Sequence, residues 1–188
     1  MSRRKLDKII VIDLEATCWE PKWSKPKGES SEIIEIGVCF LDMRTGERKD
    51  KTSYYIRPTR STVSKFCTQL TGITPELLKE KGIPFGDAIN KLRKEFGPSQ
   101  RTWASWGAYD KKELEKNCEH HGIEYPMGVN HINAKNSWAF KHGLSKELGL
   151  KRALDQVGMK FEGKQHSGAD DAWNIAKLLW AVMKPADK

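Results

Sequence analysis

The sequence predicts a single α/β domain in which helices flank a mixed β-sheet. Apolar, β-branched runs dominate the first third of the chain, and later apolar residues recur at helical spacing with short strands between them. Strands that come first and then alternate with helices are typical of a layered α/β domain. The 188 residues contain no repeat or linker. We therefore expect one domain over 1–188, with a basic tail at 1–7 and a second tail at 184–188.

The predicted sheet begins with the β-branched run Ile9–Ile12, a strand that we expect to continue to about Leu14. A loop rich in lysine and proline follows over 18–31. Two further strands, Ile33–Leu41 and Lys51–Ile56, are expected to form a hairpin. The turn between them is expected at Arg44–Glu47, and Pro58 ends the second strand.

Helical spacing begins at Val63 and continues to Leu70, and Gly72 closes that turn of chain. Thr74 is a good N-cap for the next short helix because proline follows it. An apolar stripe on the last helix fits docking onto the sheet. The later helices are expected at Phe85–Phe96, Tyr109–His121, Ala134–Lys141, Leu150–Val157 and from about Ser167, with short strands at Thr102–Ser105 and Val129–Ile132.

The charge balance favours a polyanionic partner. Lys and Arg number 33 against 25 Asp and Glu, a formal net charge of +8, which suits nucleic acid or an anionic membrane surface. No stretch approaches the ~20 apolar residues of a membrane span. The basic start of the chain leads only into Ile9–Ile12, too short a run for a secretory signal. We expect an intracellular, cytoplasmic protein with no membrane partner.

The four cysteines do not suggest a metal or redox motif. Cys18, Cys39, Cys67 and Cys118 are widely spaced and form no C-x-x-C pair. Reduced thiols are therefore expected.

Asp13 and Glu15 are the most informative pair in the sequence. Because strand side chains alternate, both project from the same face at the end of an apolar strand. Two like charges there repel one another and lose hydration unless a cation lies between them. Mg²⁺ or Mn²⁺, hard ions that prefer oxygen ligands, would compensate both effects. A strand that runs out to the surface is the alternative, and this pair alone does not exclude it.

Further acids and one histidine lie at the starts of later helices. Asp110 follows Trp106-Gly-Ala-Tyr109 at a strand-to-helix junction, where it could equally be a helix N-cap. Asp171 and its neighbour Asp170 lie in the first turn of the last helix, where the helix dipole favours acids in any case. Neither structural role accounts for His166, five positions before Asp171.

In this order the motifs resemble the DEDDh branch of the ribonuclease-H-like 3′→5′ exonucleases. The local sequence is closer still to the histone-mRNA 3′-exonuclease (enhanced-RNAi) family and to the bacterial exonucleases once labelled inhibitors of sporulation. The resemblance runs from about Lys8 to Met183 and is carried by the blocks at 12–20, 32–37, 66–74, 105–110 and 166–174.

The resemblance implies a ribonuclease-H-like mixed five-stranded sheet flanked by helices. It places the metal-ligand roles on Asp13, Glu15, Asp110 and Asp171 and the general-base role on His166. Two ions about 4 Å apart can activate a water and stabilise the leaving oxygen. Asp13 would bridge them, Glu15 and Asp171 would complete the first site, and Asp110 would support the second. A neutral imidazole at His166 can take the proton of the water near neutral pH.

The resemblance also places Leu70, Thr71, Gly72 and Ile73 beside the terminal nucleotide. Gly72 is explained equally well as a plain helix stop. Just beyond the carboxylates, a second segment is expected to line the same pocket, and it consists of Ala16, Thr17 and Cys18.

Five of the seven tryptophans divide into two groups. Trp19 and Trp23 lie among three lysines at 22, 25 and 27, a mixture that suits single-stranded nucleic acid. The alternative is a solvated loop whose tryptophans cover the sheet edge. Trp173 and Trp180, on the last helix, are expected to have a packing role, and Trp103 is expected to lie in the core.

The expected activity is metal-dependent hydrolysis from the 3′ end of nucleic acid, with release of nucleoside 5′-monophosphates by a monomer. RNA as the substrate rests on the subfamily resemblance alone, and a DNA exonuclease of proofreading or general type is the alternative. A non-catalytic nucleic-acid-binding module should lack an acid or the histidine, whereas this chain has all five. A domain that binds an anionic membrane should have an amphipathic helix with a basic face, and the last helix carries few basic residues on its exposed side.

Overall fold

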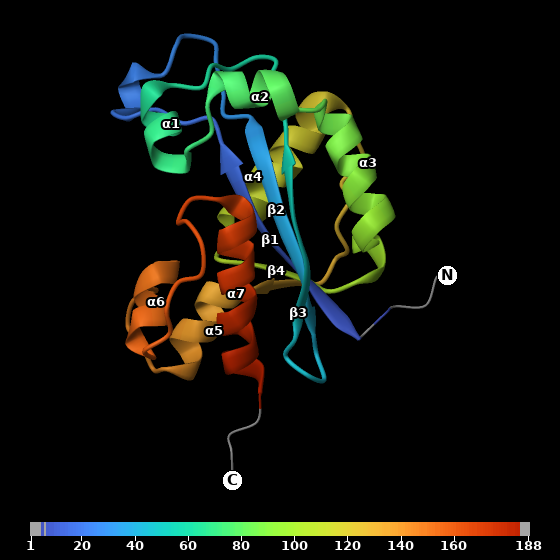
Figure 1. The fold of residues 1–188 in the computed structure, drawn as a ribbon, viewed down its shortest axis with the longest axis vertical. Helices are drawn as coiled ribbons and strands as arrows, with labels where there is room; N and C mark the ends of the chain where they lie inside the picture. The colour runs from blue at the N-terminus through green and yellow to red at the C-terminus, as the bar shows by residue number, and fades with distance from the viewer. Residues whose placement is uncertain (1–4, 6, 185–188) are drawn as a thin grey trace.

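A computed structural model describes Lys5 and residues 7–184 of the chain, so most of the two predicted tails lies outside the described residues. The first strand of the sheet, β1 (Lys8–Ala16), lies at its centre (Figure 1). The strand order is β3-β2-β1-β4-β5, with antiparallel pairing on one side of β1 and parallel pairing on the other. The other strands are β2 (Ile33–Asp42), β3 (Arg48–Tyr55), β4 (Trp103–Ser105) and β5 (His131–Asn133). The expected mixed five-stranded sheet is confirmed.

Both faces of the sheet are covered by helices, so the molecule has three layers (Figure 1). On one face α7 lies across the strands with α5 and α6 beside it, and on the other face lie α3 and α4. The short helices α1 and α2 lie beyond the carboxyl end of β1. The helices are α1 (Lys65–Thr71), α2 (Pro75–Lys81), α3 (Phe85–Phe96), α4 (Tyr109–His121), α5 (Ala134–Lys141), α6 (Leu150–Gln156) and α7 (Gly168–Met183).

The alternation of β1 divides the core in two. Ile10, Ile12 and Leu14 pack toward α3 and α4, whereas Ile9 and Val11 pack toward α7. Asp13 and Glu15 continue the second row. The strand therefore delivers both acids to the α7 face, at the end where its apolar row stops.

Several predicted boundaries were wrong by a few residues. The third strand begins at Arg48 rather than Lys51, and the fifth covers His131–Asn133 rather than Val129–Ile132. Both strands carry polar residues, so their extent is set by pairing with a neighbour rather than by apolar pattern. The loop predicted over 18–31 contains a short 3₁₀ turn at Lys22–Ser24.

The aromatic core was predicted correctly. Trp103 is fully buried, and Trp173 and Trp180 pack against the α7 face of the sheet. The four cysteines are free thiols, as expected.

Candidate active site

The end of β1 is open on its β4 side, and Asp110 closes it. β4 pairs with β1 only as far as Val11, and the backbone N–H of Leu14 donates instead to Oδ1 of Asp110 over 3.0 Å. Asp110 lies in the first turn of α4, whose N-cap is Ala108. The N-cap alternative for Asp110 is therefore wrong: the buried carboxylate reaches across to the strand that carries the other acids.

Asp171 enters from the opposite face, in the first turn of α7. Its Oδ2 accepts the backbone N–H of His166 over 2.9 Å, which fixes the segment that leads into the helix. His166 adopts a left-handed backbone conformation with φ of +59°, uncommon outside glycine and frequent at functional sites. The neighbouring Asp170 points elsewhere, since it accepts from the side chain of Lys51 and the backbone of Lys164.

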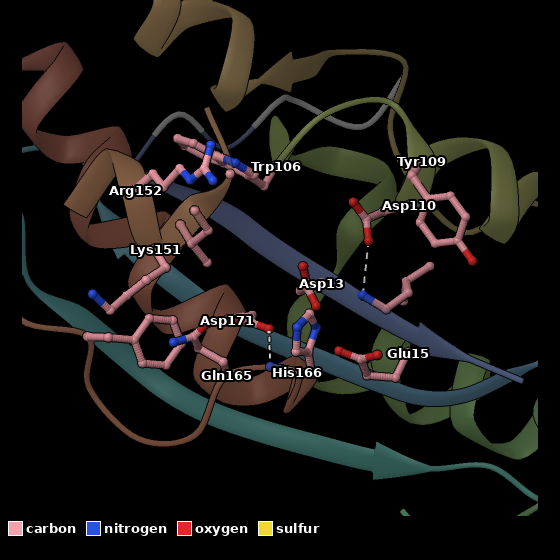
Figure 2. Close-up of a pocket in the computed structure, with 14 residues that line it drawn as sticks. Asp13, Glu15, Trp106, Tyr109, Asp110, Lys151, Arg152, Gln165, His166 and Asp171 are labelled. Atoms are coloured by element: carbon pink, nitrogen blue, oxygen red, sulfur yellow. Dashed lines mark hydrogen bonds between the residues drawn. The ribbon is translucent and has the colours of Figure 1, made fainter. Parts of the chain in front are cut away.

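These residues converge on one region (Figure 2). Ligand atoms of Glu15, His166 and Asp171 all lie within 4.8 Å of one another, close enough to share one ion. Asp13 lies between them and Asp110 in the view of Figure 2. The structure thus brings together all five residues of the predicted catalytic set, from β1, α4, α7 and the segment before α7.

The acids make this region electrostatically unfavourable without a cation. Burial, and then repulsion from the neighbouring acids, raises the pKa of Glu15 to about 8 and the pKa of Asp13 well above its ordinary value. Burial likewise raises the pKa of Asp171 to about 7 and that of Asp110 to about 6, although backbone N–H groups lower both in part. A divalent cation would remove this repulsion, so the donor set fits one.

The acids line a cavity of about 580 Å³ whose other wall was not predicted. That wall carries two cations at the start of α6, together with aromatic and amide side chains (Figure 2). Nothing in the local sequence distinguishes the two cations from an ordinary solvated helix face, because only the fold turns them toward the acids. The residues of this wall are Trp106, Tyr109, Lys151, Arg152, Phe161 and Gln165.

The expected nucleotide-binding segments lie beside this cavity rather than on its wall. The Cys67 thiol of α1 donates to the carbonyl of Ala16 over 3.6 Å, which joins α1 to the end of β1. The ammonium of Lys164 donates to the carbonyl of Thr71 over 3.1 Å, which joins the last residue of α1 to the segment before α7. Ala16, Thr17, Thr71 and Ile73 are buried, Cys18, Trp19 and Leu70 are half-buried, and Gly72 is exposed with φ of +79°.

Trp23 does not cover the sheet edge, because its side chain is 85% exposed. That alternative is wrong for Trp23. An exposed tryptophan beside Lys22 and Lys25 remains compatible with the predicted nucleic-acid contact.

Comparison with known proteins identifies the class of this fold and site. The nuclease domain of 3′hExo, a DEDDh family member bound to rAMP, superposes with a TM-score of 0.82 at 31% identity over 96% of this chain and 92% of that one. A 3′-exonuclease solved in a study of histone mRNA stem-loop recognition gives a TM-score of 0.84 at 29% identity over 96% of this chain and 65% of that one. The fold is ribonuclease-H-like, of the divalent-metal-dependent DEDDh type.

Sequence relatives agree. The 3′-5′ exonuclease Snipper of Drosophila melanogaster is 32% identical over 94% of this chain and 69% of its own length. Human 3′-5′ exoribonuclease 1 is 32% identical over 95% of this chain and 53% of its own length. The family model described as exonuclease (RNase T) matches residues 10–179. The chain belongs to this exonuclease family.

The chain spans only part of several relatives, including 29% of human ERI1 exoribonuclease 2. Within the described residues, no helix has both the length and the apolar character needed to cross a bilayer.

Proposed function

We propose that this protein is a metal-dependent 3′→5′ exonuclease that removes nucleoside 5′-monophosphates from RNA. The observation that carries the proposal is the convergence on one cavity of four acids from β1, α4 and α7 with His166 from the segment before α7. Structural acids are satisfied by donors, but Asp13 and Glu15 accept no hydrogen bond within the described residues. Their arrangement therefore calls for a cation.

The oxygen-rich donor set suits Mg²⁺ or Mn²⁺. Asp13, Glu15 and Asp171 would hold one ion, and Asp110 with Asp13 would support a second. When bound, such ions supply positive charge that stabilises the leaving oxygen and make water easier to deprotonate.

His166 is exposed to the cavity and can accept a proton from the attacking water. The water oxygen then bonds to the terminal phosphorus while the bond from phosphorus to the 3′ oxygen of the preceding nucleotide breaks. The terminal nucleotide leaves with a 5′-phosphate, and the 3′ oxygen takes up a proton from solvent water, so the shortened strand ends in a 3′-hydroxyl. The hydrogen bond from the backbone of His166 to Asp171 keeps this imidazole beside the acids.

The wall opposite the acids is suited to the strand itself. Lys151 and Arg152 offer positive charge to phosphates, and Trp106 and Phe161 offer aromatic surface. RNA is preferred in the proposal because several relatives are exoribonucleases by name.

The test is to incubate the protein with 5′-labelled RNA and DNA oligomers, single- and double-stranded, in Mg²⁺, Mn²⁺ or EDTA. We expect stepwise shortening of RNA with either metal, none in EDTA, and slower shortening of DNA. The Asp13→Asn variant should be inactive, whereas Glu119→Gln, an exposed change on α4, should match the wild type. Equal rates on DNA would refute the RNA preference. Binding without metal-dependent shortening would indicate a non-catalytic module.

A further inference from the structure

A further acid, the buried Glu35, lies directly beside the proposed site. Glu35 is on β2, opposite Glu15 in the antiparallel register, and is 1% exposed. Unlike Glu15, it is fully engaged by donors. The backbone N–H of Gly168 donates to its Oε2 over 3.0 Å, that of Ala169 donates to Oε1 over 3.4 Å, and the Ser53 hydroxyl donates to Oε1 over 2.6 Å.

The two backbone donors are the first N–H groups of α7. These groups have no partner within a helix and are usually satisfied by the N-cap side chain. The N-cap of α7 is Ser167, and its side chain makes no capping hydrogen bond. A carboxylate from the neighbouring strand takes that role, and its charge also matches the positive end of the helix dipole.

The backbones of β2 and α7 meet at two glycines. A Cβ on Gly37 would lie 1.8 Å from the carbonyl carbon of Gly168, and a Cβ on Gly168 would lie 3.0 Å from the carbonyl oxygen of Asp13. Only glycine permits so close an approach at Gly37. The first turn of α7 therefore lies directly over the strands that carry Glu35 and Asp13.

We infer that Glu35 is a positioning residue that holds the first turn of α7 on β2, so that Asp171 and His166 face Asp13 and Glu15. A negative charge at position 35 adds to the repulsion that Asp13, Glu15 and Asp171 experience. A neutral residue at position 35 would avoid this repulsion. An acid at this position is therefore explained by the hydrogen bonds that its two oxygens accept from α7 and Ser53. This role rests on the proposed function, because it explains how the acids of that site come together.

The experiment compares Glu35→Gln and Glu35→Ala with the wild type and with Glu95→Gln. Glu95 is a matched control because it accepts a hydrogen bond from Tyr54 on the opposite side of the sheet. We expect Glu35→Ala to lower kcat about 100-fold, since displacement of a catalytic group by about 1 Å has an effect of that size. KM for RNA should change less than threefold. Glu35→Gln retains one acceptor oxygen and should recover part of the loss.

Hydrogen exchange in EDTA separates this inference from the proposed function, because it requires no activity. A peptide covering 166–175 should exchange at least tenfold faster in Glu35→Gln, while peptides from α3 remain unchanged. The inference is overturned if this peptide exchanges at the wild-type rate in Glu35→Gln. It is also overturned if a folded Glu35→Ala has a kcat within twofold of the wild type. A rise in KM equal to the fall in kcat also overturns it, because Glu35 would then act in substrate binding. If Glu35→Ala does not fold, Glu35→Gln alone decides. If the wild type is inactive but the 166–175 peptide still exchanges faster in Glu35→Gln, the proposed function is refuted. The inference that Glu35 holds the first turn of α7 on β2 then still stands.

Discussion

Replacing Glu15 with glutamine should stabilise the metal-free protein at alkaline pH, although it should abolish the proposed activity. Glu15 is 8% exposed, and no described donor binds its carboxylate. Burial and then repulsion from Asp171 and Glu35 raise its pKa from 4.5 to about 8. Glutamine keeps the shape and removes the charge, so this unfavourable term disappears.

The sign follows from proton binding. The unfolded chain releases the Glu15 proton near pH 4.5, whereas the folded protein keeps it until about pH 8. Between these values the folded state binds more protons, so the free energy of unfolding falls as the pH rises and levels off above pH 8. The two pKa values differ by about 3.5, which corresponds to an upper limit of ~5 kcal/mol. Water in the open cavity weakens the effect, and we expect about 2–4 kcal/mol at pH 8 and under ~1 kcal/mol at pH 5.

Thermal unfolding in EDTA at pH 5 and pH 8 measures this difference. At ~3 °C per kcal/mol for a chain of this size, Glu15→Gln should melt roughly 6–12 °C above the wild type at pH 8 and within about 3 °C of it at pH 5. The exposed Glu119→Gln should show no such dependence. Mg²⁺ or Mn²⁺ should raise the Tm of the wild type more than that of Glu15→Gln. A variant that melts below the wild type at both pH values would refute the reasoning.

Three further predictions concern catalysis and binding. His166→Ala should lower kcat about 10²–10⁴-fold with little change in Tm, because the side chain is exposed; full turnover in a kinetic assay would exclude the general-base role. Asp110→Asn still offers an oxygen to the backbone of Leu14, so circular dichroism should show a native fold while single-turnover assays show a rate loss of at least ~10²-fold. Arg152→Ala should raise KM for RNA and reduce the slope of log KM against log salt by about 0.7, and an unchanged slope in a salt titration would place Arg152 outside the strand path.

The strand that carries Asp13 and Glu15 could be predicted because a short β-branched run and a period of two are properties of the local sequence. The same holds for α3, whose apolar spacing and closing Gly97 give its bounds without reference to the rest of the fold. Asp110 and Asp171 could be located at helix starts for the same reason. Their convergence was inferred from a family resemblance, since local pattern does not say which helix starts meet.

Other residues beside the site could not be predicted from the sequence, because their positions depend on contacts between distant segments of the chain. Glu35 faces Glu15 because β2 pairs with β1 in one particular register, and a shift by one residue would turn it to the other face. Lys151 and Arg152 face the acids only because α6 packs beside α7. Both depend on contacts between segments far apart in the chain.

The number of hydrogen-bond donors around each acid distinguishes acids that stabilise the fold from acids that are proposed to bind a metal ion. Glu32 is 2% exposed, yet hydrogen bonds from Thr59, Arg60 and Ser61 outweigh burial and hold its pKa below the ordinary value. Glu35 is likewise saturated by donors, from α7 and β3. Glu15 is 8% exposed and Asp13 is half-buried, and neither carboxylate accepts a hydrogen bond within the described residues. Folding alone would favour a neutral residue in place of Asp13 or Glu15 but not in place of Glu32 or Glu35, and this difference supports the proposal that the unsatisfied pair holds a cation.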